Sequence, residues 1–223
     1  MAFPLESLTL YDPHVSDIPT YDNGEVLISL YDYHTKIILE KTEPGASSTH
    51  ALAFWLRSGA CARLVSATES LPNGYCFLIK ETVRPASLQA AYFDRSLIEA
   101  RKRHPDACER QLKEAASKYT APPNVAGHPT GGAIDITLAT AEGQELDLGC
   151  AYDDDEIKSG GKCLSRAENI SGEAKQHRAI MFGALFQAGF VNYPFEWWHW
   201  SYGDKYWAFM AGRPFAIYDV ALE

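Results

Sequence analysis

The stretch GHPTGGAIDITL, residues 127–138, decides the fold that this chain can adopt. Its second half alternates like a β-strand that buries Ile134 and Ile136 or their neighbours. Asp135 interrupts the apolar run, and a carboxylate inside such a strand is costly unless it is paired or bound to a cation. Gly131 and the glycine after it let the backbone bend closely around a site. The stretch therefore predicts a buried strand that carries a carboxylate with a partner.

A second stretch, EWWHW at residues 196–200, completes a set of groups that could bind a metal ion. A hydrolytic zinc centre needs three protein ligands, a fourth position for water and a nearby base. His128, Asp135 and His199 can supply the three ligands, which gives one Zn²⁺ per chain. Glu196 can serve as the base. The alternative is that Asp135 pairs with an arginine and that the tryptophans are plain core.

The spacing within the second stretch predicts a local irregularity of the backbone. Glu196 and His199 are three residues apart, so on a helix they share a face, whereas in a strand they point to opposite faces. The aromatic composition favours a strand. A twist or bulge must then bring the two side chains to one site.

These stretches resemble the two signature segments of the zinc D-alanyl-D-alanine dipeptidases, the VanX-like family. Two more segments support this resemblance. LIKETVRP at 78–85 is similar to a family strand that ends in arginine-proline, and LGCAYD at 148–153 is similar to a family segment that ends in aspartate. The resemblance covers residues 20–212 in the same order and with similar spacing. It implies that Arg84 acts on the scissile carbonyl and that Asp153 helps to bind the free amino group of a dipeptide.

The chain departs from the family pattern at two places. Thr82 and Val83 stand where the family commonly has Gly-Tyr, and Ala126 stands where many members have a serine. That serine is associated with substrate binding, so recognition of the substrate carboxylate is expected to differ here.

The resemblance implies a zinc-dependent dipeptidase that splits D-alanyl-D-alanine into two D-alanines, in the setting of cell-wall peptidoglycan. Glu196 would take a proton from the zinc-activated water and pass it to the leaving amine. Arg84, always charged and with a rigid fork of donors, could meet the oxyanion. One alternative is the same chemistry on longer substrates, by a D,D-carboxypeptidase or a peptidoglycan endopeptidase. Another is a non-catalytic zinc-binding protein, although the presence of both Glu196 and Arg84 argues against it. For Arg84 itself, the alternative is an ordinary surface ion pair.

Composition predicts a globular protein without a polyanionic partner. The 223 residues are 46% hydrophobic and 22% charged, and we expect one domain over residues 1–223 with an irregular Pro- and Asp-rich arm at 1–24. A net charge of −9 without a basic cluster argues against nucleic acid or an anionic membrane surface as partner. The start lacks a basic leader and an apolar run, and no stretch approaches the length of a membrane span, so a cytoplasmic location is expected. The five cysteines, an odd number without a Cys-x-x-Cys pair, fit reduced thiols.

The order of elements predicts an α+β fold: a central antiparallel sheet flanked by helices, with the zinc site in a cleft on the sheet. The expected strands cover residues 26–30, 75–81, 133–138, 144–148, 196–202 and 206–210. The expected helices cover residues 49–71, 85–104, 106–118 and 171–189, the third of them capped by Asp106 with Glu109. The loop at 153–172 is either a lid over the substrate or a surface excursion.

Overall fold

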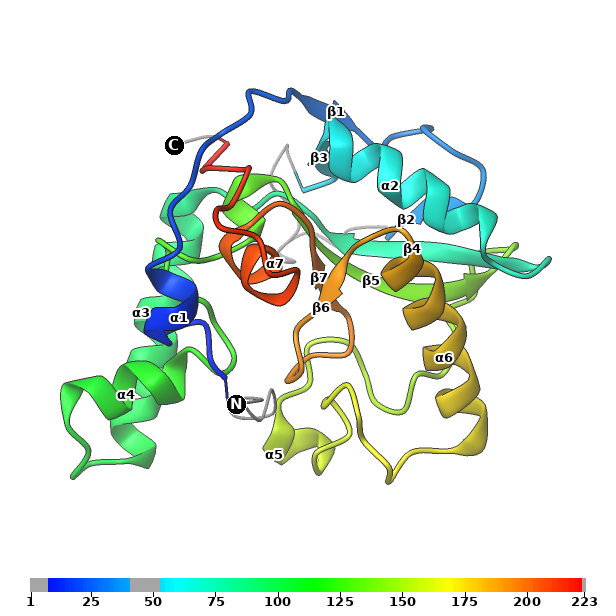
Figure 1. The fold of residues 1–223 in the computed structure, drawn as a ribbon. Coiled ribbons are helices and arrows are strands. Elements are labelled where there is room, and N and C mark those ends of the chain that lie inside the picture. Colours follow the sequence, from blue (N-terminus) through cyan, green and yellow to red (C-terminus); the bar gives the residue numbers. More distant parts are fainter. Residues whose placement is uncertain (1–7, 41–52, 222–223) are drawn as a thin grey trace.

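The structure, a computed structural model, describes residues 8–40 and 53–221 (Figure 1). A five-stranded sheet lies at its centre, in the order β2-β4-β5-β7-β6. The strands are β2 (Ile37–Leu39), β4 (Tyr75–Glu81), β5 (Ala133–Thr140), β7 (His199–Ser201) and β6 (Val191–Asn192). The α+β class is therefore confirmed.

The prediction of an antiparallel central sheet is wrong at one edge. β2 pairs with β4 in parallel, while the other neighbours in the sheet are antiparallel, so the sheet is mixed. Parallel pairing requires a long crossover connection. The chain between the two strands supplies it, through β3 (Trp55–Arg57) and α2 (Ser58–Glu69). No strand was expected over the residues of β2, so the crossover was not predicted.

A second, two-stranded sheet joins β1 (Leu27–Ser29) to β3 in antiparallel register. The helix expected over residues 49–71 begins at Ser58, because β3 comes directly before it; residues 49–52 lie outside the described part. Residues 144–148 do not form a strand. They contact β5 through an isolated bridge between Ala139 and Glu145.

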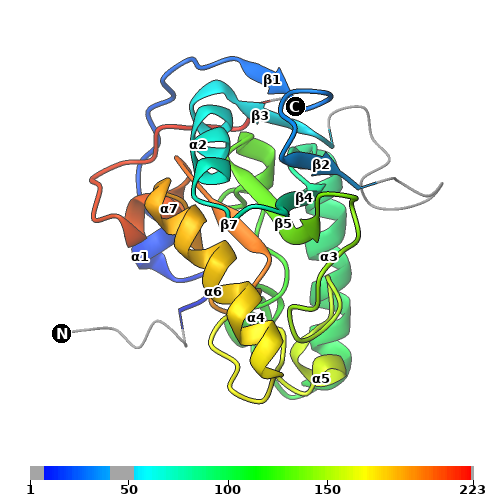
Figure 2. The same cartoon turned by 90° about the vertical axis from the view of Figure 1, so that its right-hand side faces the viewer.

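Helices cover both sides of the central sheet (Figures 1 and 2). α2 and α6 (Gly172–Gln187) lie on one side, and α3 (Ala86–Arg103) and α4 (Glu109–Ala116) lie on the other. α6 begins after Ser171, whose hydroxyl accepts a hydrogen bond from Ala174 N at 3.0 Å, as its position in the sequence predicts. The predicted cap of α4 is wrong: the helix starts after Cys108, whose N–H donates to Gln111 Oε1 at 2.9 Å.

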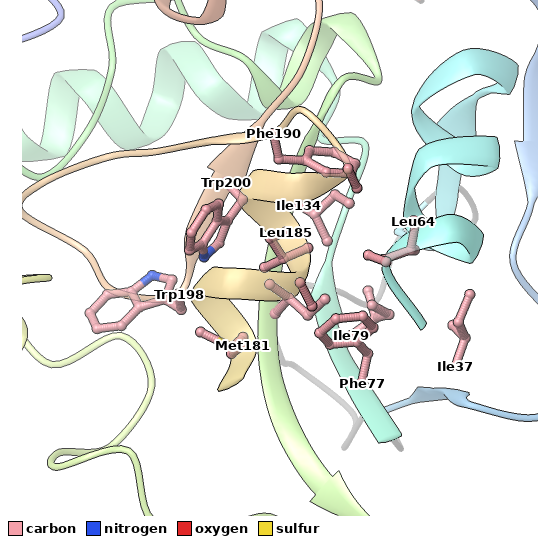
Figure 3. Close-up of a cluster of buried hydrophobic side chains, with 14 of the residues drawn as sticks. Ile37, Leu64, Phe77, Ile79, Ile134, Met181, Leu185, Phe190, Trp198 and Trp200 are labelled. Carbon is pink, nitrogen blue, oxygen red and sulfur yellow. The ribbon is translucent and has the colours of Figure 1, made fainter. Parts of the chain in front are cut away.

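The main core fills the space between the central sheet and the helices α2 and α6 (Figure 3). Ile79 of β4 and Ile134 of β5 meet Leu64 of α2 and Met181 of α6, and all four are fully buried. Burying a side chain of this size stabilises the fold by about 1.5–3 kcal/mol. Alternation along β5 then turns Asp135 to the other side of the sheet, away from this core.

The strand expected at residues 206–210 is wrong, because the chain forms the helix α7 (Lys205–Met210) there. Asp204 caps this helix, since its Oδ1 accepts a hydrogen bond from Trp207 N at 2.7 Å. The aromatic residues that suggested a strand form the buried face of this helix, with Tyr206 and Trp207 buried.

Short helices complete the described chain: α1 (Pro13–Ser16), the 3-10 helix η2 (His128–Thr130) and α5 (Glu156–Ser159). α1 lies in the arm expected to be irregular. Within residues 8–40 and 53–221, no helix combines the length and apolar character needed to cross a membrane.

Candidate metal centre

The three expected metal ligands come from η2, β5 and β7, which meet at one place in the sheet. Asp135 lies directly opposite His199 in the antiparallel register of β5 and β7. His128 begins η2, and Gly131, at φ +74°, turns the chain from η2 into β5. A Cβ at Gly131 would come within 2.6 Å of Leu27, so the close approach requires glycine.

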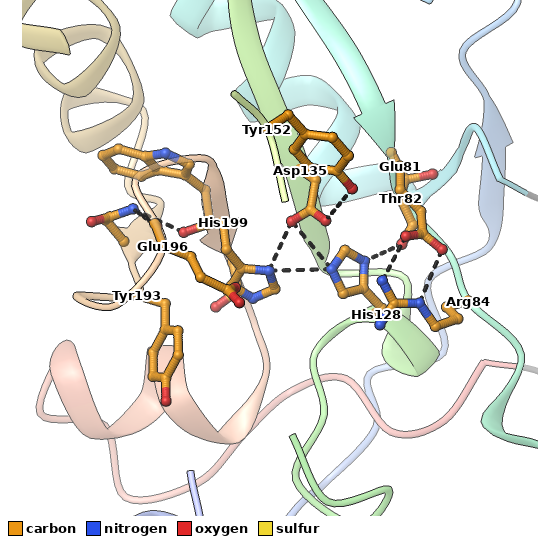
Figure 4. A network of polar contacts seen from close by, with 12 residues as sticks. Glu81, Thr82, Arg84, His128, Asp135, Tyr152, Tyr193, Glu196 and His199 are labelled. Atoms are coloured by element: carbon orange, nitrogen blue, oxygen red, sulfur yellow. Dashed lines mark hydrogen bonds and ion pairs between the residues drawn. The ribbon is translucent and has the colours of Figure 1, made fainter. Parts of the chain in front are cut away.

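The ligand atoms of these residues form a small triangle (Figure 4). His128 Nε2 is 3.2 Å from His199 Nδ1 and 3.3 Å from Asp135 Oδ1, and the third edge, His199 Nδ1 to Asp135 Oδ1, measures 2.9 Å. Ligands held at 2.0–2.1 Å around a tetrahedral zinc ion stand about 3.3 Å apart. The triangle therefore has the size of one face of such a site.

Neighbouring groups orient these ligands. His128 Nδ1 lies 2.5 Å from the carbonyl oxygen of Thr82, so this nitrogen donates a hydrogen bond and the lone pair of Nε2 points into the triangle. Burial alone would raise the pKa of Asp135, but the imidazoles of His128 and His199 hold it well below its usual range. The carboxylate thus stays ionised. Two imidazoles and one carboxylate that converge in this way suit zinc.

Tyr152 also contacts this cluster, which the sequence analysis missed. Its hydroxyl donates a hydrogen bond to Asp135 Oδ2 at 3.0 Å. Burial and the nearby carboxylates of Asp135 and Glu81 raise the pKa of Tyr152 well above its usual value, so the phenol keeps its proton. The residue lay within the quoted segment 148–153, but nothing in the sequence indicated its partner.

A turn brings Glu196 to the same cavity as His199. β7 starts only at His199, whose N–H donates to the carbonyl of Glu196 at 3.2 Å. Asn192 holds this turn, since its Nδ2 lies 3.1, 3.3 and 2.9 Å from the carbonyl oxygens of Glu196, Trp197 and His199. The backbone is thus irregular where the spacing predicted it. Asn192 was missed, because its contacts are set by the turn and not by a motif.

The carboxylate of Glu196 lacks a hydrogen-bond donor among the described residues, and the charge of Arg84 offsets the rise of its pKa only in part. The Glu196 side chain lines the cavity. Burial, together with the carboxylates of Asp135 and Asp153, raises the pKa of Glu196 well above its usual range. A carboxyl group with a raised pKa can accept and return a proton near neutral pH.

Arg84 is fixed in the cavity wall by buried partners. Its Nε and one terminal nitrogen donate to the two oxygens of Glu81 at 3.0 and 2.5 Å, and the other terminal nitrogen donates to Gln89 Oε1 at 2.9 Å. The Glu81 side chain is 1% exposed and that of Arg84 13%, so the pair is buried and is not a surface ion pair. A register shift after Ile79 sets Glu81 opposite Asp135 on β5.

Asp153 lies at the same cavity in a left-handed backbone conformation, with φ +63°. Few residues other than glycine adopt this conformation, and it often marks a functional position. Burial and the Asp135 carboxylate raise the pKa of Asp153 to about 6.

The loop at 153–172 is anchored near its middle. Arg178 of α6 donates to the carbonyl oxygens of Leu148, Leu164 and Lys162 at 2.7, 2.7 and 2.6 Å. α5 lies in the first part of this loop. The loop is therefore held against α6 at Lys162 and Leu164.

The cavity that these residues share has a volume of about 290 Å³. Aromatic side chains form part of its wall, including Trp198 and Tyr193, while Trp197 and Trp200 are buried in the main core. Ala126, which replaces the family serine, also lines the cavity.

An α+β fold that gathers two imidazoles and several carboxylates around one small cavity is typical of metal-dependent hydrolases. The chain belongs to a particular family of this class, the M15 peptidases described as D-Ala-D-Ala dipeptidases, whose sequence model matches residues 46–218. It is 28% identical to the D-alanyl-D-alanine dipeptidase of Synechocystis sp. in an alignment that covers 86% of this chain and 87% of the relative. The family resemblance found in the sequence is thereby confirmed, and the chain is a peptidase of this family.

Proposed function

We propose that this protein is a zinc-dependent dipeptidase that hydrolyses D-alanyl-D-alanine to two D-alanines. The observation that carries the proposal is the cluster of His128, Asp135 and His199, whose ligand atoms lie within 4.8 Å of one another. Zinc bound by these three residues would lower the pKa of a bound water and polarise the scissile carbonyl. The remaining chemistry falls to Glu196 and Arg84.

Glu196 would move the proton. Its raised pKa and free carboxylate oxygens suit a group that takes the proton of the attacking water and delivers it to the leaving amine. Its place in the turn held by Asn192 supports this role, because the turn fixes the carboxylate beside His199. A proton carrier must lie at a constant distance from both the water and the amine.

Arg84 would stabilise the oxyanion. Glu81 and Gln89 hold three of its five donors and leave two N–H groups for a substrate oxygen. A guanidinium held in this way does not have to reorganise as negative charge develops on the carbonyl oxygen.

Asp153 would bind the ammonium group of the dipeptide, and we therefore propose a short substrate with a free amino end. Acting on a soluble dipeptide, the enzyme would need neither a membrane nor a nucleic acid partner, and we propose a cytoplasmic location. The alternatives are a D,D-carboxypeptidase, a peptidoglycan endopeptidase and a non-catalytic zinc-binding protein.

A combined metal and activity measurement tests the proposal. The purified protein should contain one zinc ion per chain and cleave D-alanyl-D-alanine in preference to L,D- and L,L-dipeptides, and a chelator should abolish cleavage until zinc is restored. His199→Ala should lose both zinc and activity. Full zinc in His199→Ala would refute the ligand set, and zinc without cleavage in the parent would favour the non-catalytic protein.

A further inference from the structure

The two oxygens of the Asp135 carboxylate have separate partners (Figure 4). Oδ1 faces the imidazoles of His128 and His199, whereas Oδ2 accepts the hydrogen bond from the Tyr152 hydroxyl. Asp135 is 4% exposed, and in the described part of the chain Tyr152 is the hydrogen-bond donor to Oδ2. A buried carboxylate oxygen without a donor is costly.

We propose that Tyr152 is a positioning residue for the metal centre: by binding Oδ2, its hydroxyl turns Oδ1 toward the two imidazoles and strengthens the binding of zinc. This inference rests on the proposed function, because it requires that zinc bind at His128, Asp135 and His199. Partners behind a metal ligand fix its orientation, and their loss typically weakens metal binding by about 10–100-fold.

The position of the Tyr152 ring is itself fixed. Its ring meets Trp198 edge to face, with centroids 5.6 Å apart. The ammonium of Lys80 lies 5.6 Å from the centroid of the Tyr152 ring, within the range of a cation–π contact. Lys80 is 4% exposed and pairs with Glu40 at 2.5 Å and Glu145 at 2.7 Å.

The backbone around Tyr152 ties the metal centre to the proposed ammonium site. Gly149, at φ +104°, starts this segment, and a Cβ there would lie 2.5 Å from Ile170. Tyr152 points to Asp135, and the next residue, Asp153, lines the cavity. Two consecutive residues of the chain thus have separate roles: Tyr152 contacts a metal ligand, and Asp153 is the residue proposed to bind the substrate.

The test removes the hydroxyl and keeps the ring. In Tyr152→Phe, the affinity for zinc, measured by competition with a chromophoric chelator, should fall by about 10–100-fold. With Co²⁺ in place of zinc, the visible absorption should also change, because the freed Oδ2 can turn toward the ion and alter its coordination. Metal-free Tyr152→Phe should keep the circular dichroism spectrum of the parent.

Tyr193→Phe is the matched control. The Tyr193 hydroxyl also makes a buried hydrogen bond, to the carbonyl of Ser117 at 3.0 Å, and its ring lies 6.2 Å from that of His199. It contacts no oxygen of Asp135. This variant should lose thermal stability and keep the zinc affinity of the parent, so a general loss of packing is separated from a loss of ligand orientation.

A donor of another kind at the same place should restore binding. Tyr152→p-aminophenylalanine keeps the ring and supplies an N–H group, and its zinc affinity should be closer to that of the parent than to that of Tyr152→Phe. Equal zinc affinity in the parent and Tyr152→Phe, or an equal loss in Tyr152→Phe and Tyr193→Phe, overturns the inference. Either result leaves the proposed function intact, whereas a parent protein that binds no zinc refutes the proposed function as well.

Discussion

Unlike the three expected metal ligands, Glu196 has no hydrogen-bond partner for its carboxylate among the described residues. A substitution at Glu196 can therefore remove proton transfer and leave metal binding intact. Glu196→Gln preserves volume and cannot accept the proton. We expect it to keep the parent's zinc content and to lose about two to four orders of magnitude in kcat. Its melting temperature should not fall, because the change removes a half-buried carboxylate that has no hydrogen-bond partner among the described residues.

Elemental analysis and steady-state kinetics on the same samples check this prediction. A kcat within a few-fold of the parent would assign the base to another group. Loss of zinc from Glu196→Gln would instead make this residue part of the metal centre.

Arg84 should act on the transition state more than on the bound substrate. In Arg84→Lys, a point charge replaces the fork that Glu81 and Gln89 now hold, so kcat should fall more than KM rises. Arg95→Lys serves as control, because Arg95 lines the same cavity and is exposed, with its guanidinium near the ring of Tyr92. We expect kinetics close to those of the parent for that variant.

A large rise in KM at constant kcat in Arg84→Lys would reassign the residue to substrate binding. Equal changes in kcat and KM in Arg84→Lys and Arg95→Lys would show that Arg84 has no specific role in the transition state.

Residues that could bind a metal ion or move a proton could be predicted from the sequence. The residues that hold those side chains in place could not. His128 and Asp135 stand close together beside glycines, and a carboxylate within an apolar strand indicates a partner. Tyr152 and Asn192 act through contacts that depend on tertiary structure, as does Gln89, which joins Arg84 to the carbonyl of Ala121. No spacing rule connects such residues.

Among the elements, the turn before β7 decides whether Glu196 faces the cavity. Asn192 Nδ2 lies within hydrogen-bond distance of three of its carbonyl oxygens, and in Asn192→Ala each of these oxygens keeps only its other donor, which is the N–H of His199, the indole N–H of Trp200 or the N–H of Tyr193. We expect a loss of about 1–3 kcal/mol in the free energy of unfolding, with a fall in kcat. Urea denaturation and kinetics measure the two effects.

Asn169→Ala is the matched control, since Asn169 is an exposed residue that donates to one carbonyl, that of Gly160, at 2.9 Å. It should change stability and kcat little. An Asn192→Ala protein with full activity would show that the turn holds its shape without this side chain.

The strands that bury their side chains most fully were the best predicted elements. β4 and β5 read as apolar or alternating runs, and their bounds agree with the prediction within two residues. β2 was missed because three residues carry too little periodicity. At α7 the aromatic residues suggested a strand, but the cap at Asp204 and burial of one helix face prevailed. The expectation of a single domain over residues 1–223 stays a prediction.

In the whole molecule, the carboxylate of Glu25 ties the N-terminal arm to α2 and to the C-terminal segment. It accepts hydrogen bonds from Gly59 N at 2.6 Å, from the Tyr218 hydroxyl at 2.6 Å and from Asn23 Nδ2 at 2.8 Å. Gly59, which weakens α2 as an isolated helix, is required here, because a Cβ would lie 2.6 Å from Glu25. Burial raises the pKa of Glu25, but these hydrogen bonds lower it below its usual range.

Stability should therefore fall in acid. With a folded-state pKa below the unfolded value of about 4.3, Glu25 stabilises the fold fully above about pH 5, and this contribution is lost as the pH falls through the folded-state pKa. The urea midpoint of the parent should exceed that of Glu25→Gln at pH 7, and the difference should shrink toward pH 3. A difference that is constant with pH would show that the hydrogen bonds do not depend on the charge.

The cavity as a whole should select short substrates with a free amino end. Asp153 lines the cavity that holds His128 and Glu196, and its carboxylate would form a charge-assisted hydrogen bond with the ammonium of a dipeptide. Acetylating that amine removes its charge and leaves the carboxylate without this partner, and a hydrogen bond to a charged group contributes about 1.5–3 kcal/mol. The loop at 153–172, held by Arg178, would also leave little room beyond the second residue.

D-alanyl-D-alanine should thus be cleaved, while its N-acetyl form and a peptidoglycan pentapeptide should be worse substrates by about one to two orders of magnitude in kcat/KM, as the lost hydrogen bond requires. Asp153→Asn should narrow the gap between the dipeptide and its N-acetyl form, because the neutral amide does not demand an ammonium partner. Ser165→Ala, at a hydroxyl bound to the carbonyl of Tyr193 at 3.0 Å in the same loop, should leave the gap unchanged. Comparable turnover of the dipeptide and the pentapeptide would favour a D,D-carboxypeptidase, with the same metal ligands and the same base acting on a longer chain.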